Sequence, residues 1–171
     1  LNFMRWQELK DNPQTRKKLK QRAEIIKLIR QFFEKENFLE IDSPLLVARP
    51  GLEPNLNPME VLAHRENGQP VKSYLITSPE LSLKKALAGG LTKIFQLGKC
   101  FRDHEPWGET HNPEFTMLEW YEVGSDYKDV MKRTEELVAF VAKKLGGALK
   151  IKYQGKEIDL TPPWPKLTMA E

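Results

Sequence analysis

The chain has 171 residues, and its 27 lysines and arginines nearly balance 24 aspartates and glutamates, for a formal net charge of +3. That length fits one domain with its own core, and so small a net charge does not by itself indicate a nucleic-acid-binding protein. The single cysteine, Cys100, excludes an internal disulfide framework. Because the chain shows neither an export signal nor the roughly 20 consecutive apolar residues that span a membrane, we expect a cytoplasmic protein.

The first expected element is a long amphipathic helix over residues 15–36, and Asn12 followed by Pro13 is a typical helix start. Its other face is basic over residues 16–22. This stretch could bind phosphate, but a solvated helix surface is the better interpretation. The apolar residues that recur at three- and four-residue steps, and so share one helical face, are Leu19, Ala23, Ile26, Ile29 and Phe33.

Extended segments follow this helix. In residues 38–51 the Pro44 nitrogen cannot donate to a central β-ladder, so this segment belongs at a sheet edge or an interface. Residues 52–80 contain two β-prone pieces around the turn-forming residues 66–68. This arrangement predicts a β-hairpin.

A short helix and a pair of strands come next. The helix is expected to have Ser78 as its cap, Pro79 at its first position and its end at the glycine pair 89–90. Residues 92–102 and 113–123 are β-prone runs on either side of a loop. We expect these two runs to pair as antiparallel strands.

The last expected elements are a second long helix and a small hairpin. The helix covers residues 125–147, begins at Ser125 or Asp126 and ends at a glycine pair. Residues 149–160 predict a hairpin that turns at Gln154 and Gly155.

Strand alternation sorts the side chains of the central pair onto two faces. One face is expected to form a floor for a polar ligand, while the other faces the core and carries Thr116, Leu118 and Trp120. Gly98 leaves room above this floor for a flat group. The floor residues of the second run are Phe115, Met117, Glu119 and Tyr121, and those of the first are Gln96, Gly98, Cys100 and Arg102.

The loop between these strands, residues 103–113, is longer than a usual hairpin loop, and loops of this length are commonly functional. Arg102 lies at its root, where a guanidinium can make paired hydrogen bonds to phosphate oxygens. His111 and Glu105 can reach a phosphate, ribose or base. The loop therefore predicts a nucleotide site, unless Arg102 simply pairs at the surface with Asp103, Glu105 or Glu119.

Three segments resemble a known family. Residues 101–121, "FRDHEPWGETHNPEFTMLEWY", resemble motif 2 of the class II aminoacyl-tRNA synthetases, and residues 111–121 resemble its lysine-specific branch. Residues 38–46, "FLEIDSPLL", resemble motif 1, which forms the dimer interface in that family. Residues 77–87, "TSPELSLKKAL", resemble its amino-acid-binding segment. The resemblance implies an α+β fold in which an antiparallel sheet is flanked by helices.

The resemblance also implies nucleotide contacts. Arg102 would bind the α-phosphate of ATP and stabilise the charge that develops when the substrate carboxylate attacks it. Phe115 would stack on adenine, and His111 and Asn112 would lie near the phosphates and the base. In that family ATP is accompanied by magnesium.

The amino-acid contacts implied by the resemblance lie on two segments. Glu80, which follows Ser78 and Pro79, would receive the α-ammonium group of the substrate. Glu119 and Tyr121 would meet the far end of a lysine-like side chain.

Several of these assignments have alternatives. The Glu80 carboxylate is favoured in a first helical turn without any ligand, and Glu119 could pair with Lys99 on the neighbouring strand. The loop also departs from the lysine-type pattern by one extra residue, so either His104 or Glu105 takes the place of the usual glutamate. We favour Glu105, because a carboxylate accepts from an amine or a ribose hydroxyl.

Among members of this family, the short stretch before the first long helix favours the stand-alone elongation factor P lysine ligases. We expect residues 1–171 to be the amino-terminal part of the catalytic domain, with no anticodon-binding domain, with motif 3 absent and with no magnesium ligands in this chain. The complete enzyme would activate lysine or β-lysine and transfer it to elongation factor P. The alternatives are a fragment of a lysyl-tRNA synthetase that charges tRNA-Lys and a non-catalytic paralogue, and motif 1 implies a homodimer.

Overall fold

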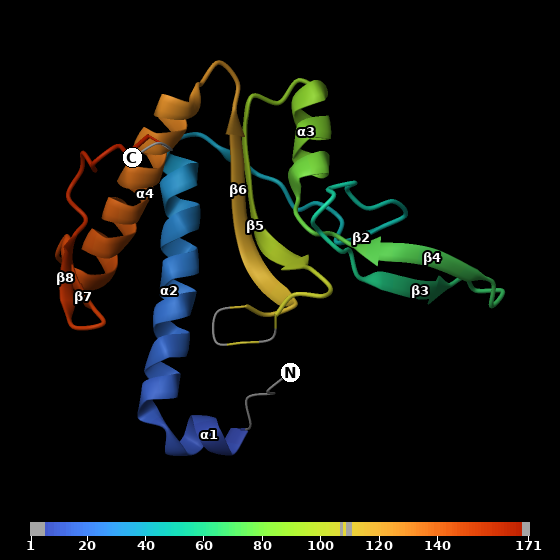
Figure 1. The fold of residues 1–171 in the computed structure, drawn as a ribbon, viewed down its shortest axis with the longest axis horizontal. Helices are drawn as coiled ribbons and strands as arrows, with labels where there is room; N and C mark the ends of the chain where they lie inside the picture. Colours follow the sequence, from blue (N-terminus) through green and yellow to red (C-terminus); the bar gives the residue numbers. More distant parts are fainter. Residues whose placement is uncertain (1–5, 107, 109–110, 169–171) are drawn as a thin grey trace. The chain divides into compact units, whose positions relative to one another are not determined.

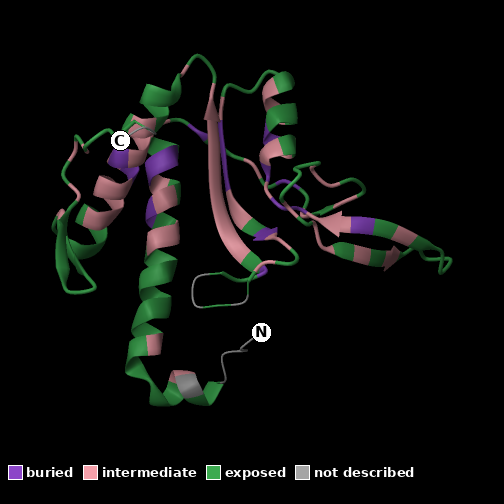
Figure 2. Ribbon diagram, viewed as in Figure 1, coloured by how far each residue is buried: buried purple, intermediate pink, exposed green. Residues whose placement is uncertain are grey.

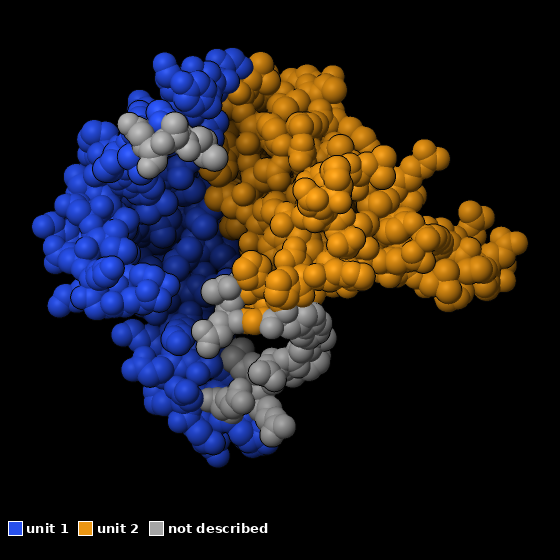
Figure 3. Space-filling view, viewed as in Figure 1, with its two compact units in different colours: residues 1–36, 124–171 blue, residues 37–123 orange. Residues whose placement is uncertain are grey.

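The computed structural model describes residues 6–106, 108 and 111–168, whose path is drawn in Figure 1. The chain divides into two compact units (Figure 3). Unit 1 comprises residues 1–36 and 124–171, and unit 2 comprises residues 37–123. No helix in the described part of the chain is long and apolar enough to cross a membrane.

Unit 1 is built on two long helices. Phe32 of one helix packs against Phe140 of the other, with ring centroids 5.7 Å apart, and Arg133 Nη1 lies 3.1 Å from Glu36 Oε2. The elements of this unit are α1 (Trp6–Asp11), α2 (Pro13–Lys35), α4 (Tyr127–Gly146), β7 (Lys150–Tyr153) and β8 (Lys156–Asp159).

Helix α2 begins as predicted, because the Asn12 side chain accepts the backbone N–H groups of Gln14 and Thr15 at 3.0 and 3.1 Å. The apolar residues expected on one face of this helix are not buried along its whole length. The buried residues are confined to the C-terminal half, whereas Leu19 and Ala23 are exposed (Figure 2). Periodicity marks a face that can be buried, and only packing partners decide how far along the helix it is buried.

The remaining elements of unit 1 match their predictions. Asp126, rather than Ser125, caps α4 through a capping box with Asp129, and the helix ends at Gly147 in the left-handed conformation, with φ of 74°. Strands β7 and β8 form the predicted hairpin, and its turn residues Gln154 and Gly155 both have positive φ.

Unit 2 contains two small sheets and one helix. The sheet orders are β1-β5-β6 and β2-β4-β3. Pro44 lies between the edge strands β1 and β2, as its missing N–H requires. The elements are β1 (Leu39–Glu40), β2 (Leu46–Val47), β3 (Glu60–His64), β4 (Pro70–Leu75), α3 (Glu80–Ala88), β5 (Lys93–Phe101) and β6 (Glu114–Glu122).

The predicted strand pairings of unit 2 are confirmed. Strands β3 and β4 form the expected hairpin, and β5 and β6 pair antiparallel over their full length. The expected antiparallel sheet is nevertheless divided between two sheets, and β1 pairs with β5 in parallel. The expected difference between the two faces of β6 is also not seen, because residues 115–122 are all partly buried, and the buried core of this sheet comes from β5, at Ile94 and Phe95.

Candidate functional site

The floor of the candidate site is the face shared by β5 and β6. Residues directly opposite each other in an antiparallel pair project to the same side of the sheet. The register therefore confirms the face deduced from strand alternation. The opposed pairs on it are Gln96 with Glu119, Gly98 with Met117 and Cys100 with Phe115.

At Gly98, in the middle of this floor, no side chain projects from β5. A Cβ atom at Gly98 would meet only the Gln96 side chain, at 3.4 Å from its Nε2. Gln96 is buried, and its Oε1 accepts the backbone N–H of Ser43 at 3.4 Å. Cys100 is also buried, and burial raises the pKa of its thiol to about 11. The centre of the floor is thus uncharged.

Arg102 lies at the end of β5 and reaches over this floor. Its backbone N–H donates to the Pro113 carbonyl at 2.9 Å, which ties the two ends of the loop together. Its Nε–H donates weakly to the Thr77 carbonyl at 3.4 Å, and its guanidinium carbon lies 5.0 Å from the ring centroid of Phe115. The alternative of a surface ion pair is not seen, since Arg102 pairs with no carboxylate of the described residues.

The loop after Arg102 is described in part. The Asp103 N–H donates to the Asn57 carbonyl at 2.7 Å, and His104 follows with φ of 58°. Glu105 is partly buried, whereas His111 and Asn112 are exposed. The nucleotide roles of Glu105, His111 and Asn112, and the choice between His104 and Glu105, stay predictions.

Glu119 and Tyr121 form a polar pair on β6. The Tyr121 hydroxyl donates to Glu119 Oε1 at 2.6 Å. Partial burial raises the pKa of Glu119, and the hydrogen bond from Tyr121 opposes this rise. Burial raises the pKa of Tyr121 as well. Glu119 does not pair with Lys99, which lies 2.6 Å from Glu114 instead.

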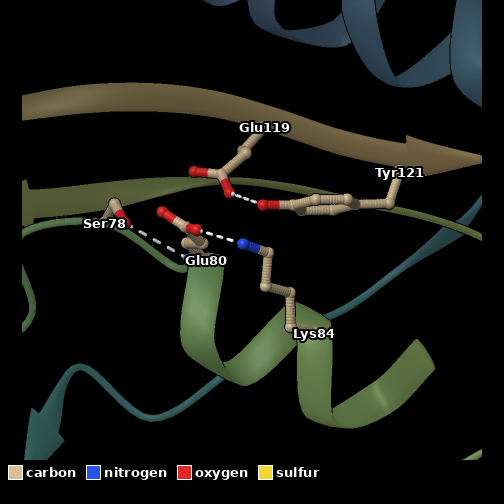
Figure 4. Close-up of polar contacts among 5 residues, drawn as sticks. All are labelled: Ser78, Glu80, Lys84, Glu119 and Tyr121. Carbon is tan, nitrogen blue, oxygen red and sulfur yellow. Dashed lines mark hydrogen bonds and ion pairs between the residues drawn. The ribbon is translucent and has the colours of Figure 1, made fainter. Parts of the chain in front are cut away.

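The start of α3 supplies a second carboxylate, Glu80 (Figure 4). Ser78 Oγ accepts the Glu80 N–H at 3.3 Å, as a helix cap does. The predicted start of the helix is wrong by one residue, because Pro79 is the N-cap residue and Glu80 the first helical residue. One Glu80 oxygen accepts a hydrogen bond from Lys84 Nζ.

Lys84 was missed by the sequence analysis. Its position four residues after Glu80 is the spacing at which oppositely charged side chains meet on a helix, and this signal could have found it. Figure 4 shows the Glu80–Lys84 pair beside the Glu119–Tyr121 pair. Two carboxylates, a phenol and an ammonium group therefore gather between α3 and β6.

A cavity of about 440 Å³ lies next to this group, between β2, the segment that follows it and α3. Its walls include Ser78, together with Leu46, Gly51, Glu53 and Leu81. Among the predicted substrate residues only Ser78 lines this cavity. The cavity therefore adjoins the cluster formed by Glu80, Lys84, Glu119 and Tyr121, but none of these four residues lines it.

The described residues do not fit a magnesium ion. Among them, no three His, Cys, Asp or Glu side chains are grouped so that they could hold a metal.

Comparison with known proteins gives the site its context. The family profile described as "tRNA synthetases class II (D, K and N)" matches residues 3–171. The chain is 41% identical over 167 residues to the lysine–tRNA ligase of Thermoanaerobacter sp. (strain X514), which covers 98% of the chain and 32% of that protein. It is 40% identical over the same length to the lysine–tRNA ligases of Prochlorococcus marinus (strain MIT 9211) and Nostoc punctiforme (strain ATCC 29133 / PCC 73102), covering 32% and 29% of them.

The chain thus spans about a third of the length of these relatives. The family match extends over nearly every residue, including both strands of the floor and the helix that carries Glu80. The chain belongs to the family of class II tRNA synthetases (D, K and N).

Proposed function

We propose that this chain forms part of the catalytic domain of an enzyme that activates lysine with ATP and passes the lysyl group to tRNA-Lys. One observation carries the proposal. Arg102, which has no ionic partner among the described residues, lies over the Phe115 ring at one end of the β5–β6 floor. Glu119, which is partly buried and accepts a hydrogen bond from Tyr121, lies toward the other end. The names of the relatives support lysine and tRNA as the two substrates.

The amino-acid end fits an ammonium group. Glu119 is partly buried and holds its place through the Tyr121 hydroxyl, so it can accept from the far end of a lysine side chain. Glu80, placed by Ser78 and Pro79 at the start of α3, would accept from the α-ammonium group. A shorter or neutral amino acid would leave Glu119 without an ammonium partner, and this would disfavour its binding.

The nucleotide end fits a base and a phosphate. Phe115 offers an aromatic face, which the Arg102 guanidinium covers in this structure. We infer that the guanidinium leaves this face when it turns toward the α-phosphate, so that adenine stacks in its place. Glu105, His111 and Asn112 would complete the contacts to the ribose, phosphates and base.

The reaction follows from these positions. A carboxylate oxygen of lysine attacks the α-phosphorus of ATP, the bond between the α-phosphorus and the bridging oxygen breaks, and pyrophosphate leaves with that oxygen. Negative charge grows on the α-phosphoryl oxygens, where the Arg102 guanidinium can stabilise it in the transition state. The hydroxyl of the tRNA terminus then attacks the lysyl carbonyl, and AMP departs.

Transfer to elongation factor P, with lysine or β-lysine, is the second candidate. Its acceptor amine would attack the same adenylate carbonyl. The short stretch before the first long helix is the sequence feature that favours it. The length of this stretch does not distinguish a tRNA acceptor from a protein acceptor, because the lysine–tRNA ligases that match the chain are about three times as long as the matched segment. The relatives named here are lysine–tRNA ligases, which favours the tRNA acceptor.

The test uses the full-length protein. Lysine-dependent exchange of pyrophosphate into ATP, compared with β-lysine, ornithine and arginine, measures activation. Transfer from radiolabelled lysine to tRNA-Lys and to elongation factor P, run in parallel, measures the acceptor. Charging of tRNA-Lys alone supports the proposal, labelling of elongation factor P alone selects the second candidate, and no exchange with any amino acid rejects both. Dimer formation through α2 and Pro44 stays a prediction, which sedimentation would test.

A further inference from the structure

We propose that Lys84 is a positioning residue of the amino-acid site, which holds the Glu80 carboxylate in place and separates its charge from that of Glu119 before the substrate arrives. The inference rests on the proposed function and adds a residue to it. The substrate's α-ammonium group would then share Glu80 with Lys84.

The geometry pairs Lys84 with one of the two carboxylates, Glu80. It lies one helical turn after Glu80 on α3, and its Nζ donates to Glu80 Oε1. The order glutamate then lysine is the favoured one for such a pair. Because one oxygen of Glu80 is bound by Lys84, the other is left to accept from a ligand, and Figure 4 shows this pair beside Glu119 and Tyr121.

The charges around Glu119 explain why a cation is needed there. Besides burial, the nearby carboxylates Glu80 and Glu53 raise the pKa of Glu119, while Lys84 and the hydrogen bond from Tyr121 lower it. The residue opposite Glu119 on β5, Gln96, carries no charge. Without Lys84, Glu119 would more readily bind a proton, and a neutral carboxylic acid attracts an ammonium group weakly.

Lys84 differs in this respect from an ordinary surface partner of a glutamate. Lys72 on β4 also pairs with a glutamate, Glu60 at 2.7 Å, and is as exposed as Lys84. The pKa of Lys72 is raised by Glu60 and Tyr74, whereas that of Lys84 is raised by three carboxylates, Glu80 first and then Glu119 and Glu53. The Lys72–Glu60 pair therefore offers a matched control outside the site.

The experiment measures pyrophosphate exchange by the full-length protein with Lys84→Met, Lys84→Arg and the control Lys72→Met. For Lys84→Met we expect the KM for lysine to rise, and to rise more near pH 6 than near pH 8, because loss of the nearby cation lets Glu119 bind a proton more readily. The KM for ATP should stay within about twofold, because the side-chain hydrogen bond of Lys84 is to Glu80 and not to Arg102 or Phe115. Lys84→Arg should restore most of the lysine affinity, and Lys72→Met should behave as wild type.

Three results would overturn the inference. The first is an unchanged KM for lysine in Lys84→Met, and the second is a rise in that KM that does not depend on pH. The third is an equal rise in the KM values for lysine and for ATP together with a lowered melting temperature, which would mean that Lys84 only supports the fold. A wild-type protein without lysine-dependent exchange would instead refute the proposed function, and this inference with it. Failure of the proposed function is thus seen in the wild-type protein, whereas failure of this inference alone is seen only in the behaviour of Lys84→Met.

Discussion

Replacement of Arg102 by alanine tests the nucleotide end of the site most directly. In this structure the guanidinium makes one long hydrogen bond, from Nε to the Thr77 carbonyl at 3.4 Å, and one contact with the Phe115 ring. Both are weak, and a partly exposed cation–π contact contributes roughly 0.5–1 kcal/mol. We therefore expect Arg102→Ala to lower the free energy of unfolding by about 1 kcal/mol, which lowers the melting temperature by only about 2–4 °C.

The expected loss of activity is much larger. Two charge-assisted hydrogen bonds from the guanidinium to the α-phosphoryl group, at roughly 1.5–3 kcal/mol each, would stabilise the transition state by about 3–6 kcal/mol. This corresponds to a fall in kcat/KM for pyrophosphate exchange of roughly 10²- to 10⁴-fold. Arg102→Lys should fall between the wild type and Arg102→Ala, because an ammonium group keeps the charge without the planar pair of donors.

Pyrophosphate exchange and thermal unfolding of the same preparations separate the two effects. Exchange by Arg102→Ala within about threefold of wild type would remove the guanidinium from the mechanism, since a group that stabilises the transition state cannot be deleted at so small a cost. A greatly lowered melting temperature of Arg102→Ala would show that Arg102 stabilises the fold, and it would refute a role confined to the transition state.

Three further substitutions or reagents test other parts of the site. Phe115→Leu should raise the KM for ATP by about tenfold through lost stacking while the KM for lysine changes little, as measured by exchange kinetics; equal changes in both would contradict the stacking role. Tyr121→Phe removes a hydrogen bond that lowers the pKa of Glu119, so the acid limb of kcat/KM for lysine should move to higher pH, and an unmoved limb would argue against the pair. Cys100, whose thiol remains protonated below a pKa of about 11, should resist iodoacetamide at pH 8 in the folded protein and react after denaturation, and rapid labelling of the folded protein would refute its burial.

Much of unit 2 follows from local patterns in the sequence. Strand alternation alone places Phe115 and Glu119 on one face, because the side-chain period of a strand is two whatever its neighbours are. Glycine and proline positions locate the ends of α3 and the turns of both hairpins, since these residues act through their own backbone angles. Such features need no knowledge of distant segments.

Features that depend on distant segments were not predictable in the same way. The parallel pairing of β1 with β5 joins residues far apart in the chain, and no local pattern encodes it. The exposed first half of α2 shows the same limit, because its apolar spacing continues where no partner packs against it. The contact of Arg102 with Phe115 required both the strand register and the side-chain conformations.

The two ends of the proposed site are linked by the strand that carries them both. Phe115 and Glu119 lie on the same face of β6 four residues apart, and a strand advances about 3.4 Å per residue, so their backbones are separated by about 14 Å. Arg102 reaches the Phe115 end and Tyr121 supports the Glu119 end. A ligand must therefore extend along the strand, with an aromatic group at one end and a cation at the other, to use both. Lysyl-adenylate has this order of groups, with the phosphate between them, so under the proposed function β6 would contact both the amino acid and the nucleotide of one ligand.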